Sequence, residues 1–141
     1  MWIYKGKEVK DKDTEGQAGF VYLITNKATG KKYVGKKLLS FRRTKKFKNK
    51  RSKKVTFESD WKTYYGSSNE LLKDIELLGR DNFSREIIRF CESRGSCNYY
   101  EMKYQVLWEV LESEDWYNDQ IRARVHRSHL RKKKIDIKPG M

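Results

Sequence analysis

The sequence has little proline, little cysteine and no long apolar run, and each absence excludes a class of protein. The single proline excludes a collagen-like or proline-rich linker chain. The two cysteines, Cys91 and Cys97, are too few for a disulfide scaffold and do not form a CxxC motif. No window approaches about 18 consecutive apolar residues, and residues 1–12 lack the apolar run of a signal peptide. We therefore expect a protein of the reducing cytoplasm without a membrane partner.

Acidic residues are scarce relative to basic ones. The 141 residues include 33 Lys and Arg against 19 Asp and Glu, so the formal net charge is +14. A charge of this size and sign predicts a polyanionic partner, with nucleic acid as the first candidate. Aromatic residues make up 13% of the chain, which argues against wholesale disorder. The length suits one domain with tails.

Hydrophobic patterning predicts an α+β fold. Residues 20–25 and 31–35 are short runs rich in β-branched and aromatic residues on either side of a turn cluster, as in an antiparallel hairpin. Residues 83–90 are predicted to form a third strand. Helices are expected over residues 67–79 and 97–112. The expected architecture is a three-stranded antiparallel sheet flanked by helices.

The predicted helix boundaries rest on specific residues. Ser67 and Glu70 fit an S-x-x-E capping box, and Gly79 is a suitable end for the first helix. The second helix is predicted from one stripe of apolar and aromatic side chains at helical spacing: Tyr100, Tyr104, Leu107 and Leu111.

Residues 36–54 are the most biased segment of the chain. Eleven of these 19 residues are Lys or Arg and none is acidic. We expect a short helix starting near Leu38, Leu39 and Phe41, and a flexible basic loop beyond Thr44. If this segment contacts six to ten phosphates, DNA affinity should fall by roughly three to five decades between 50 and 200 mM salt. The predicted DNA-binding residues are Lys36, Lys37, Arg42, Lys45, Lys46, Lys48, Lys50 and Arg51.

Two tyrosines of the predicted hairpin stand out together with their neighbours. Tyr22 and Tyr33 are eleven residues apart, Gly35 directly follows Tyr33-Val34, and Arg43 lies ten residues beyond Tyr33. A glycine at a strand end marks a bend or a close backbone approach.

This pattern resembles the GIY-YIG endonuclease family, most closely its small phage-encoded, Seg-like homing members. Phe20-Val21-Tyr22 stands where the Gly-Ile-Tyr element would be, and Tyr33-Val34-Gly35 stands where Tyr-Ile-Gly would be. Gly66-Ser67-Ser68, Glu101 and Tyr117-Asn118 continue the resemblance, which covers roughly residues 18–120.

The resemblance implies roles for these residues in metal-dependent phosphodiester hydrolysis. It implies that Glu101 binds a divalent cation, Mg²⁺ or another such as Mn²⁺, and that Arg43 contacts the scissile phosphate. It also implies that Tyr22 is the general base and that Tyr33 supports it by a hydrogen bond. Supporting residues are Gly35, Asn118 and Tyr65, the last because Tyr64-Tyr65 precedes Gly66 where many homing members have a histidine.

The implied chemistry is reasonable for these residue types. A lone carboxylate suits Mg²⁺, which keeps several water ligands and takes others from the phosphate. Arginine can contact phosphate through two parallel hydrogen bonds. Tyrosine is a poor base at its reference pKa of about 10, so it needs nearby positive charge to favour the phenolate.

These observations predict a domain organisation and a function. The expected parts are an N-terminal extension (1–17), a nuclease domain (18–120) with a basic insertion (44–60), and a basic tail (121–141). The predicted function is metal-dependent DNA cleavage. The alternative is a catalytically inactive nucleic-acid-binding protein on a nuclease-like fold. One active site cuts one strand, so a double-strand break would require a homodimer or sequential nicking.

Overall fold

The computed structural model describes residues 1–48 and 50–130, so Arg131-Lys132-Lys133-Lys134 of the predicted basic tail lies outside the described residues. The strands are β1 (Trp2–Tyr4), β2 (Lys7–Glu8), β3 (Gly19–Asn26), β4 (Lys32–Leu38), β5 (Ser40–Lys45), β6 (Lys53–Glu58) and β7 (Phe83–Cys91). The α-helices are α1 (Asn69–Leu78) and α2 (Arg94–Leu107), and short 3-10 helices are η1 (Asp11–Thr14), η2 (Trp61–Thr63), η3 (Arg80–Asn82) and η4 (Arg127–Leu130).

The central sheet has five strands in the order β2-β1-β7-β3-β4. β1 runs parallel to β7, and the other neighbouring strands are antiparallel. The predicted α+β class and the β3–β4 hairpin are confirmed, but the prediction of three strands is wrong because β1 and β2 extend the sheet. These strands have only three and two residues, which is too short to show a period-2 pattern.

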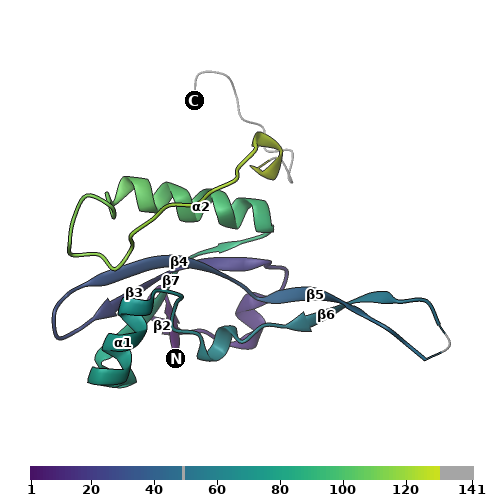
Figure 1. Cartoon of the computed structure of the whole chain (residues 1–141), viewed down its shortest axis with the longest axis horizontal. Helices are drawn as coiled ribbons and strands as arrows, with labels where there is room; N and C mark the ends of the chain where they lie inside the picture. The colour runs from purple at the N-terminus through teal and green to yellow at the C-terminus, as the bar shows by residue number, and fades with distance from the viewer. Residues whose placement is uncertain (49, 131–141) are drawn as a thin grey trace.

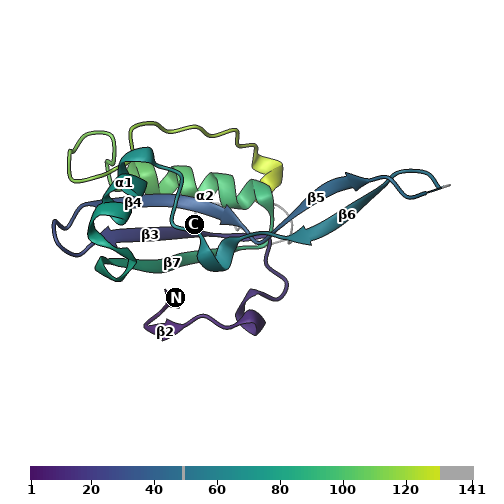
Figure 2. The same cartoon turned by 60° about the horizontal axis from the view of Figure 1, so that its bottom comes forward.

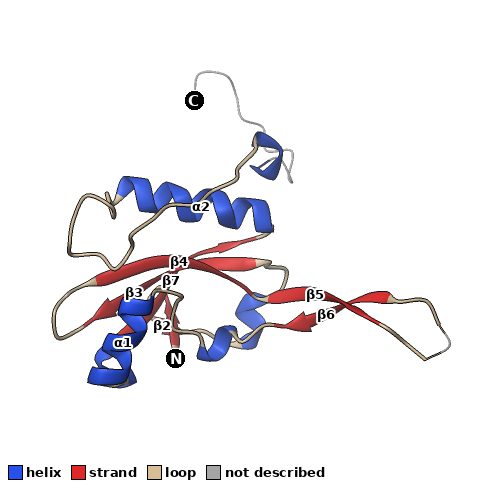
Figure 3. Ribbon diagram, viewed as in Figure 1, coloured by secondary structure: helices blue, strands red, loops and turns tan. Residues whose placement is uncertain are grey.

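The alternation of side chains along β3 creates two separate cores. Phe20, Tyr22 and Ile24 pack in the core that also contains α1, whereas Val21 packs in the core that contains Cys97 of α2. Consecutive residues of a strand point to opposite faces of a sheet, so one strand supplies both layers. Figure 3 shows the resulting arrangement, with α1 and α2 on opposite sides of the sheet.

A register shift interrupts the pairing of β3 with β7 beside Tyr22. Val21 pairs with Arg89 and the next residue, Tyr22, pairs with Ile87, so Ile88 has no partner across the strand. Such a bulge increases local twist and redirects nearby side chains, and bulges are common beside active sites.

A two-stranded arm leaves the body between β4 and η2. We use "the arm" for β5, β6 and the residues that connect them, 40–58; the two strands pair antiparallel from Ser40↔Glu58 to Lys45↔Lys53. Figures 1 and 2 show the arm extending away from the five-stranded sheet. The expected short helix near residues 38–41 is therefore wrong, and the expected loop beyond Thr44 is wrong for residues 53–58, which form β6. Residues 40–45 and 53–58 form two strands, and the pairing between them stabilises a ribbon. The basic composition of this segment does not by itself predict the pairing.

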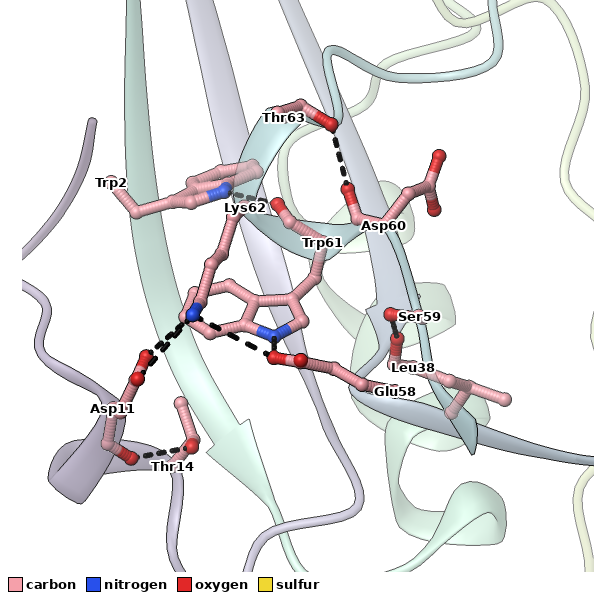
Figure 4. A network of polar contacts seen from close by, with 10 residues as sticks. All are labelled: Trp2, Asp11, Thr14, Leu38, Glu58, Ser59, Asp60, Trp61, Lys62 and Thr63. Atoms are coloured by element: carbon pink, nitrogen blue, oxygen red, sulfur yellow. Dashed lines mark hydrogen bonds and ion pairs between the residues drawn. The ribbon is translucent and has the colours of Figure 1, made fainter. Parts of the chain in front are cut away.

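A polar network holds the root of the arm against the body (Figure 4). Trp2 Nε1 donates to the carbonyl of Trp61 at 2.7 Å, and Trp61 Nε1 donates to Glu58 at 3.1 Å. Lys62 forms ion pairs with Asp11 at 3.0 Å and with Glu58 at 3.8 Å. The two ends of the arm are thereby fixed at one corner of the sheet.

The helices differ from the predictions at their ends. Ser68, rather than Ser67, caps α1 by accepting from the Leu71 N–H, while Gly79 ends the helix as predicted. α2 begins and ends earlier than expected, and Leu107 (62% exposed) and Leu111 (49% exposed) do not face the core. Within the described residues, no helix combines the length and the apolar character needed to cross a membrane.

Candidate active site

Tyr22 crosses strand β4 over a glycine. The residue lies in β3 opposite Gly35 of β4, and its side chain is only 1% exposed. A Cβ added at Gly35 would lie 2.5 Å from Tyr22 Oη, 2.7 Å from Tyr22 Cζ and 3.0 Å from Tyr33 Cε2. Only glycine leaves this space open, which explains the residue type directly after Tyr33-Val34.

Three tyrosines from separate segments meet at this point. The ring centroids of Tyr22 and Tyr33 are 6.1 Å apart, and those of Tyr22 and Tyr64 are 5.9 Å apart. Tyr22 also forms a hydrogen bond with Tyr64. The hydroxyl of Tyr33 lies 3.0 Å from Ser67 Oγ, which places the start of α1 against the cluster.

The surroundings keep Tyr22 and Tyr33 protonated in the free protein, because they raise the pKa of both side chains. Burial, then the charges of Tyr64 and Tyr33, raise the pKa of Tyr22 well above 10.0. Burial also raises the pKa of Tyr33, although the hydrogen bond with Ser67 opposes this shift. Glu101 raises both pKa values, so its negative charge acts on both hydroxyls.

Glu101 reaches the same region from α2, at the free edge of β4. Burial raises the pKa of its carboxyl, and the Lys36 ammonium and a hydrogen bond from the Lys36 backbone N–H oppose this shift. The Lys36 Nζ donates to the side-chain oxygen of Asn98, one helical turn before Glu101. α2 therefore presents an amide and a carboxylate to one lysine of the edge strand.

Asn118 occupies the next position along the same edge. Its Oδ1 accepts from the Val34 N–H at 3.0 Å, and its Nδ2 donates to the Val34 carbonyl at 2.7 Å. The side chain thus replaces a neighbouring strand for one residue of β4, and it is 8% exposed. Asn118 fixes the edge that carries Tyr33 and Lys36.

Lys37 adds positive charge on the tyrosine side of the sheet. Its Nζ lies 2.6 Å from a carboxylate oxygen of Asp60 and 4.0 Å from the centre of the Tyr64 ring. The pKa of Asp60 is lowered by its hydrogen bond and ion pair with Lys37. The lysine is consequently held beside the aromatic cluster.

The predicted phosphate ligand Arg43 lies on the arm. It is the fourth residue of β5, pairs with Val55, and places its guanidinium 5.3 Å from the centre of the Phe41 ring. Within residues 1–48 and 50–130, no contact joins Arg43 to Tyr22, Tyr33 or Glu101. The structure gathers the two tyrosines and the glutamate but not the arginine. The other predicted DNA-binding residues of the arm, Arg42, Lys45, Lys46, Lys48, Lys50 and Arg51, are exposed, whereas Lys36 and Lys37 lie at the candidate site.

Tyr65 packs against the core cluster that contains Tyr22, but its close contact is with Arg85. Its ring lies 4.2 Å from the guanidinium carbon of Arg85, a buried residue that also donates to the carbonyls of Lys62 (3.1 Å) and Tyr64 (2.8 Å). Adjacent residues of extended chain point in opposite directions. In this segment it is Tyr64 that contacts the tyrosine cluster.

Some residues of this site are not identified by sequence reasoning. Asn98 carries no distinctive spacing, although it lies three residues before Glu101 and hence on the same helix face. Ser67 stands out in the sequence as a predicted helix cap and as part of Gly66-Ser67-Ser68, but neither pattern indicates its bond to Tyr33. Tyr64 could be recognised only as one of two neighbouring tyrosines.

The residues present suit a cation that retains water ligands. In the described part of the chain, no group of three or more His, Cys, Asp or Glu side chains could hold a metal ion. The carboxylate charge of Glu101 acts on the hydroxyls of both Tyr22 and Tyr33, and that of Asp119 acts on Tyr33. A single carboxylate fits Mg²⁺, which binds one or two carboxylates and completes its shell with water and phosphate oxygens.

The α+β fold, with two tyrosines on the β3–β4 hairpin, is consistent with a nuclease domain of the GIY-YIG class. A family model described as "Putative endonuclease segE, GIY-YIG domain" matches residues 2–121, and the chain belongs to this family. By this family membership the protein is a nuclease, a hydrolase. Comparisons with curated proteins and with solved structures gave no match.

Proposed function

We propose that this chain is a phage-encoded DNA endonuclease that hydrolyses phosphodiester bonds with Mg²⁺ or Mn²⁺ as cofactor. The proposal is carried by one observation: Tyr22, Tyr33 and Glu101, from three different elements, influence one another electrostatically at the edge of β4. The net charge of the whole chain, +14, also suits a DNA substrate.

The proposed roles follow from position and charge. Glu101 would hold the cation, and a bound cation neutralises phosphate charge and activates water. Tyr22 would accept the proton of the attacking water. Tyr33, which is itself held by the bond to Ser67, would orient Tyr22. Because the raised pKa keeps Tyr22 a phenol in the free protein, the positive charge of the bound state must favour its phenolate.

Phosphate positioning is proposed for the basic groups nearest the site. Lys36 and Lys37 lie beside Glu101 and Tyr64, where they can neutralise the scissile phosphate. Arg43 keeps its proposed phosphate contact, which it would make from the arm once DNA lies along it.

The central test is metal-dependent nicking of supercoiled plasmid. We expect cleavage with Mg²⁺ and none with a chelator. Glu101→Ala should abolish cleavage while DNA binding survives, whereas Glu112→Ala, at an exposed glutamate near the same helix, should cleave normally. Tyr22→Phe should also stop cleavage. Full cleavage by Glu101→Ala or by Tyr22→Phe would remove that residue from the mechanism.

The second candidate is a catalytically inactive DNA-binding protein on the nuclease fold. The position of Arg43 on the arm favours it, because this side chain lacks contact with the site in the described residues. Both candidates bind DNA in a salt-sensitive manner, but only the enzyme nicks plasmid. If the protein cleaves plasmid, the appearance of linear plasmid without a nicked intermediate would indicate a homodimer with two active sites.

A further inference from the structure

The arm has more positive charge than any structural role requires. Residues 40–58 hold nine Lys or Arg and one acid, Glu58, which lies at the root and is engaged by Trp61 and Lys62. An isolated two-stranded ribbon is marginal in water, and like charges along it repel. A polyanion lying against the ribbon would remove this repulsion.

The two faces of the arm differ in chemistry. Because directly paired residues share a face, the register defines an aromatic face with Phe41, Phe57, Arg43, Val55, Lys45 and Lys53. On this face the rings of Phe41 and Phe57 stack with centroids 5.7 Å apart, and Arg43 lies over Phe41. The aromatic face therefore supplies the contacts that hold the two strands together.

The opposite face is polar and carries three cross-strand pairs. At the root is Ser40 with Glu58, whose carboxylate is engaged by Trp61 and Lys62, and further out are Arg42 with Thr56 and Thr44 with Lys54. In the part of the chain that the structure describes, none of the four side chains of the two outer pairs has a hydrogen bond, ion pair or ring contact. All four are exposed and all can donate hydrogen bonds.

The shape of the arm selects one kind of nucleic-acid surface. The major groove of B-form DNA, about 12 Å wide, admits a two-stranded β-ribbon, whereas the minor groove is only about 6 Å wide. The major groove of duplex RNA is too narrow and deep for side chains to read. Arginine, lysine and threonine are residues that bond to base edges in the major groove of DNA.

From these observations we infer that the arm enters the DNA major groove and that its polar face, Arg42, Thr44, Lys54 and Thr56, contacts base edges. Each strand has six residues, about 20 Å at ~3.3 Å per residue. This length matches about six base pairs at ~3.4 Å each. β4 runs from the candidate site into the arm, so the bases contacted lie to one side of the cut. Only the position of the contacted bases relative to the cut rests on the proposed function.

The test measures binding of the full chain in chelator, so that cleavage plays no part. The probes are one duplex in three forms: unmodified, with bulky groups on the C5 atoms of its pyrimidines, and saturated with a ligand of the A·T minor groove. C5 substituents fill the major groove without changing the phosphates. We expect the C5-modified duplex to bind about 10-fold more weakly and the ligand-saturated duplex to bind within about 2-fold of the unmodified one.

Variants assign the effect to the polar face. Arg42→Ala/Lys54→Ala should bind the unmodified and C5-modified duplexes equally. Lys7→Ala/Lys12→Ala removes the same charge from exposed positions on β2 and η1, and should discriminate as the wild type does. Binding of duplex RNA should fall equally in both variants. Circular dichroism checks that each variant is folded.

Two outcomes would overturn the inference: equal wild-type binding to the unmodified and C5-modified duplexes, or loss of binding mainly with the minor-groove ligand. Unchanged discrimination by Arg42→Ala/Lys54→Ala would also reject it. Failure of the proposed function looks different. In that case the wild type leaves plasmid intact with Mg²⁺ but still discriminates between the duplexes.

Discussion

Replacing Gly35 by alanine tests how closely Tyr22 depends on the strand beneath it. The new Cβ would lie 2.5 Å from Tyr22 Oη and 2.7 Å from Cζ, so the ring must move. Overpacking of this kind costs about 1–3 kcal/mol, which for a chain of this size lowers the melting temperature by roughly 4–10 °C. Displacement of the proposed base should also lower plasmid nicking by about 10- to 100-fold, since a shift of ~1 Å can cost that much.

Three further variants, Gly79→Ala, Tyr22→Phe and Tyr22→Phe/Gly35→Ala, separate crowding from general destabilisation. Gly79→Ala places a Cβ where nothing lies within 4 Å but at φ +85°, so it should cost about 1–2 kcal/mol of backbone strain and nick normally below its melting temperature. Tyr22→Phe removes Oη, the atom nearest to the added Cβ. The loss of stability caused by Gly35→Ala should therefore be about 0.5–3 kcal/mol smaller in the Tyr22→Phe protein than in the wild type. Thermal scans measure all four proteins. If Gly35→Ala melts and cleaves as the wild type does, the close approach described here is wrong.

Three other substitutions probe stability. Burial raises the pKa of Glu101 in the folded state, so ionisation of this carboxyl opposes folding above that pKa. Glu101→Gln should therefore raise the melting temperature at pH 7. The gain should vanish below about pH 4, where the carboxyl is protonated in both the folded and the unfolded state. Tyr117→Phe removes a hydroxyl that donates to Asp74 at 2.6 Å and should cost about 1–3 kcal/mol in urea unfolding with cleavage retained; an unchanged midpoint contradicts this. Arg85→Met removes the donor to the Tyr64 carbonyl. It should lower the free energy of unfolding by about 1–3 kcal/mol and should also lower cleavage. Normal cleavage would show that the position of Tyr64 does not depend on Arg85.

The elements with regular patterns could be predicted from the sequence. β3, β4 and β7 are rich enough in β-branched and aromatic residues for their existence to be predicted, and Gly79 marks the end of α1. The sequence indicates two short extended segments on either side of Tyr4-Lys5-Gly6-Lys7, but three residues show no period, so it does not predict that β1 joins the sheet, where Trp2 is 3% exposed and packs in the core. The arm was missed because exposed strands of lysine, arginine and threonine look like loop composition; only the Phe41↔Phe57 pairing reveals the ribbon.

The candidate site shows where spacing stops being informative. The family resemblance assigned Tyr22, Tyr33 and Glu101 to one site, and in the structure the charge of Glu101 acts on both tyrosines. Arg43 was assigned by its distance along the chain from Tyr33, but a strand that leaves the body carries it outward. Sequence separation cannot give direction, which here depends on whether residues 40–45 continue as a helix or as a strand.

The root of the arm has a consequence for how this domain can vary. Ser59 Oγ donates to the Leu38 carbonyl at 2.6 Å and Ser59 N–H donates to the Leu39 carbonyl at 2.9 Å, so the ends of the insertion are adjacent. Closing a longer or shorter excursion between neighbouring points changes loop entropy only slightly. Grafting a different ribbon at this junction could thus give a new target preference while the hydrolytic machinery stays intact.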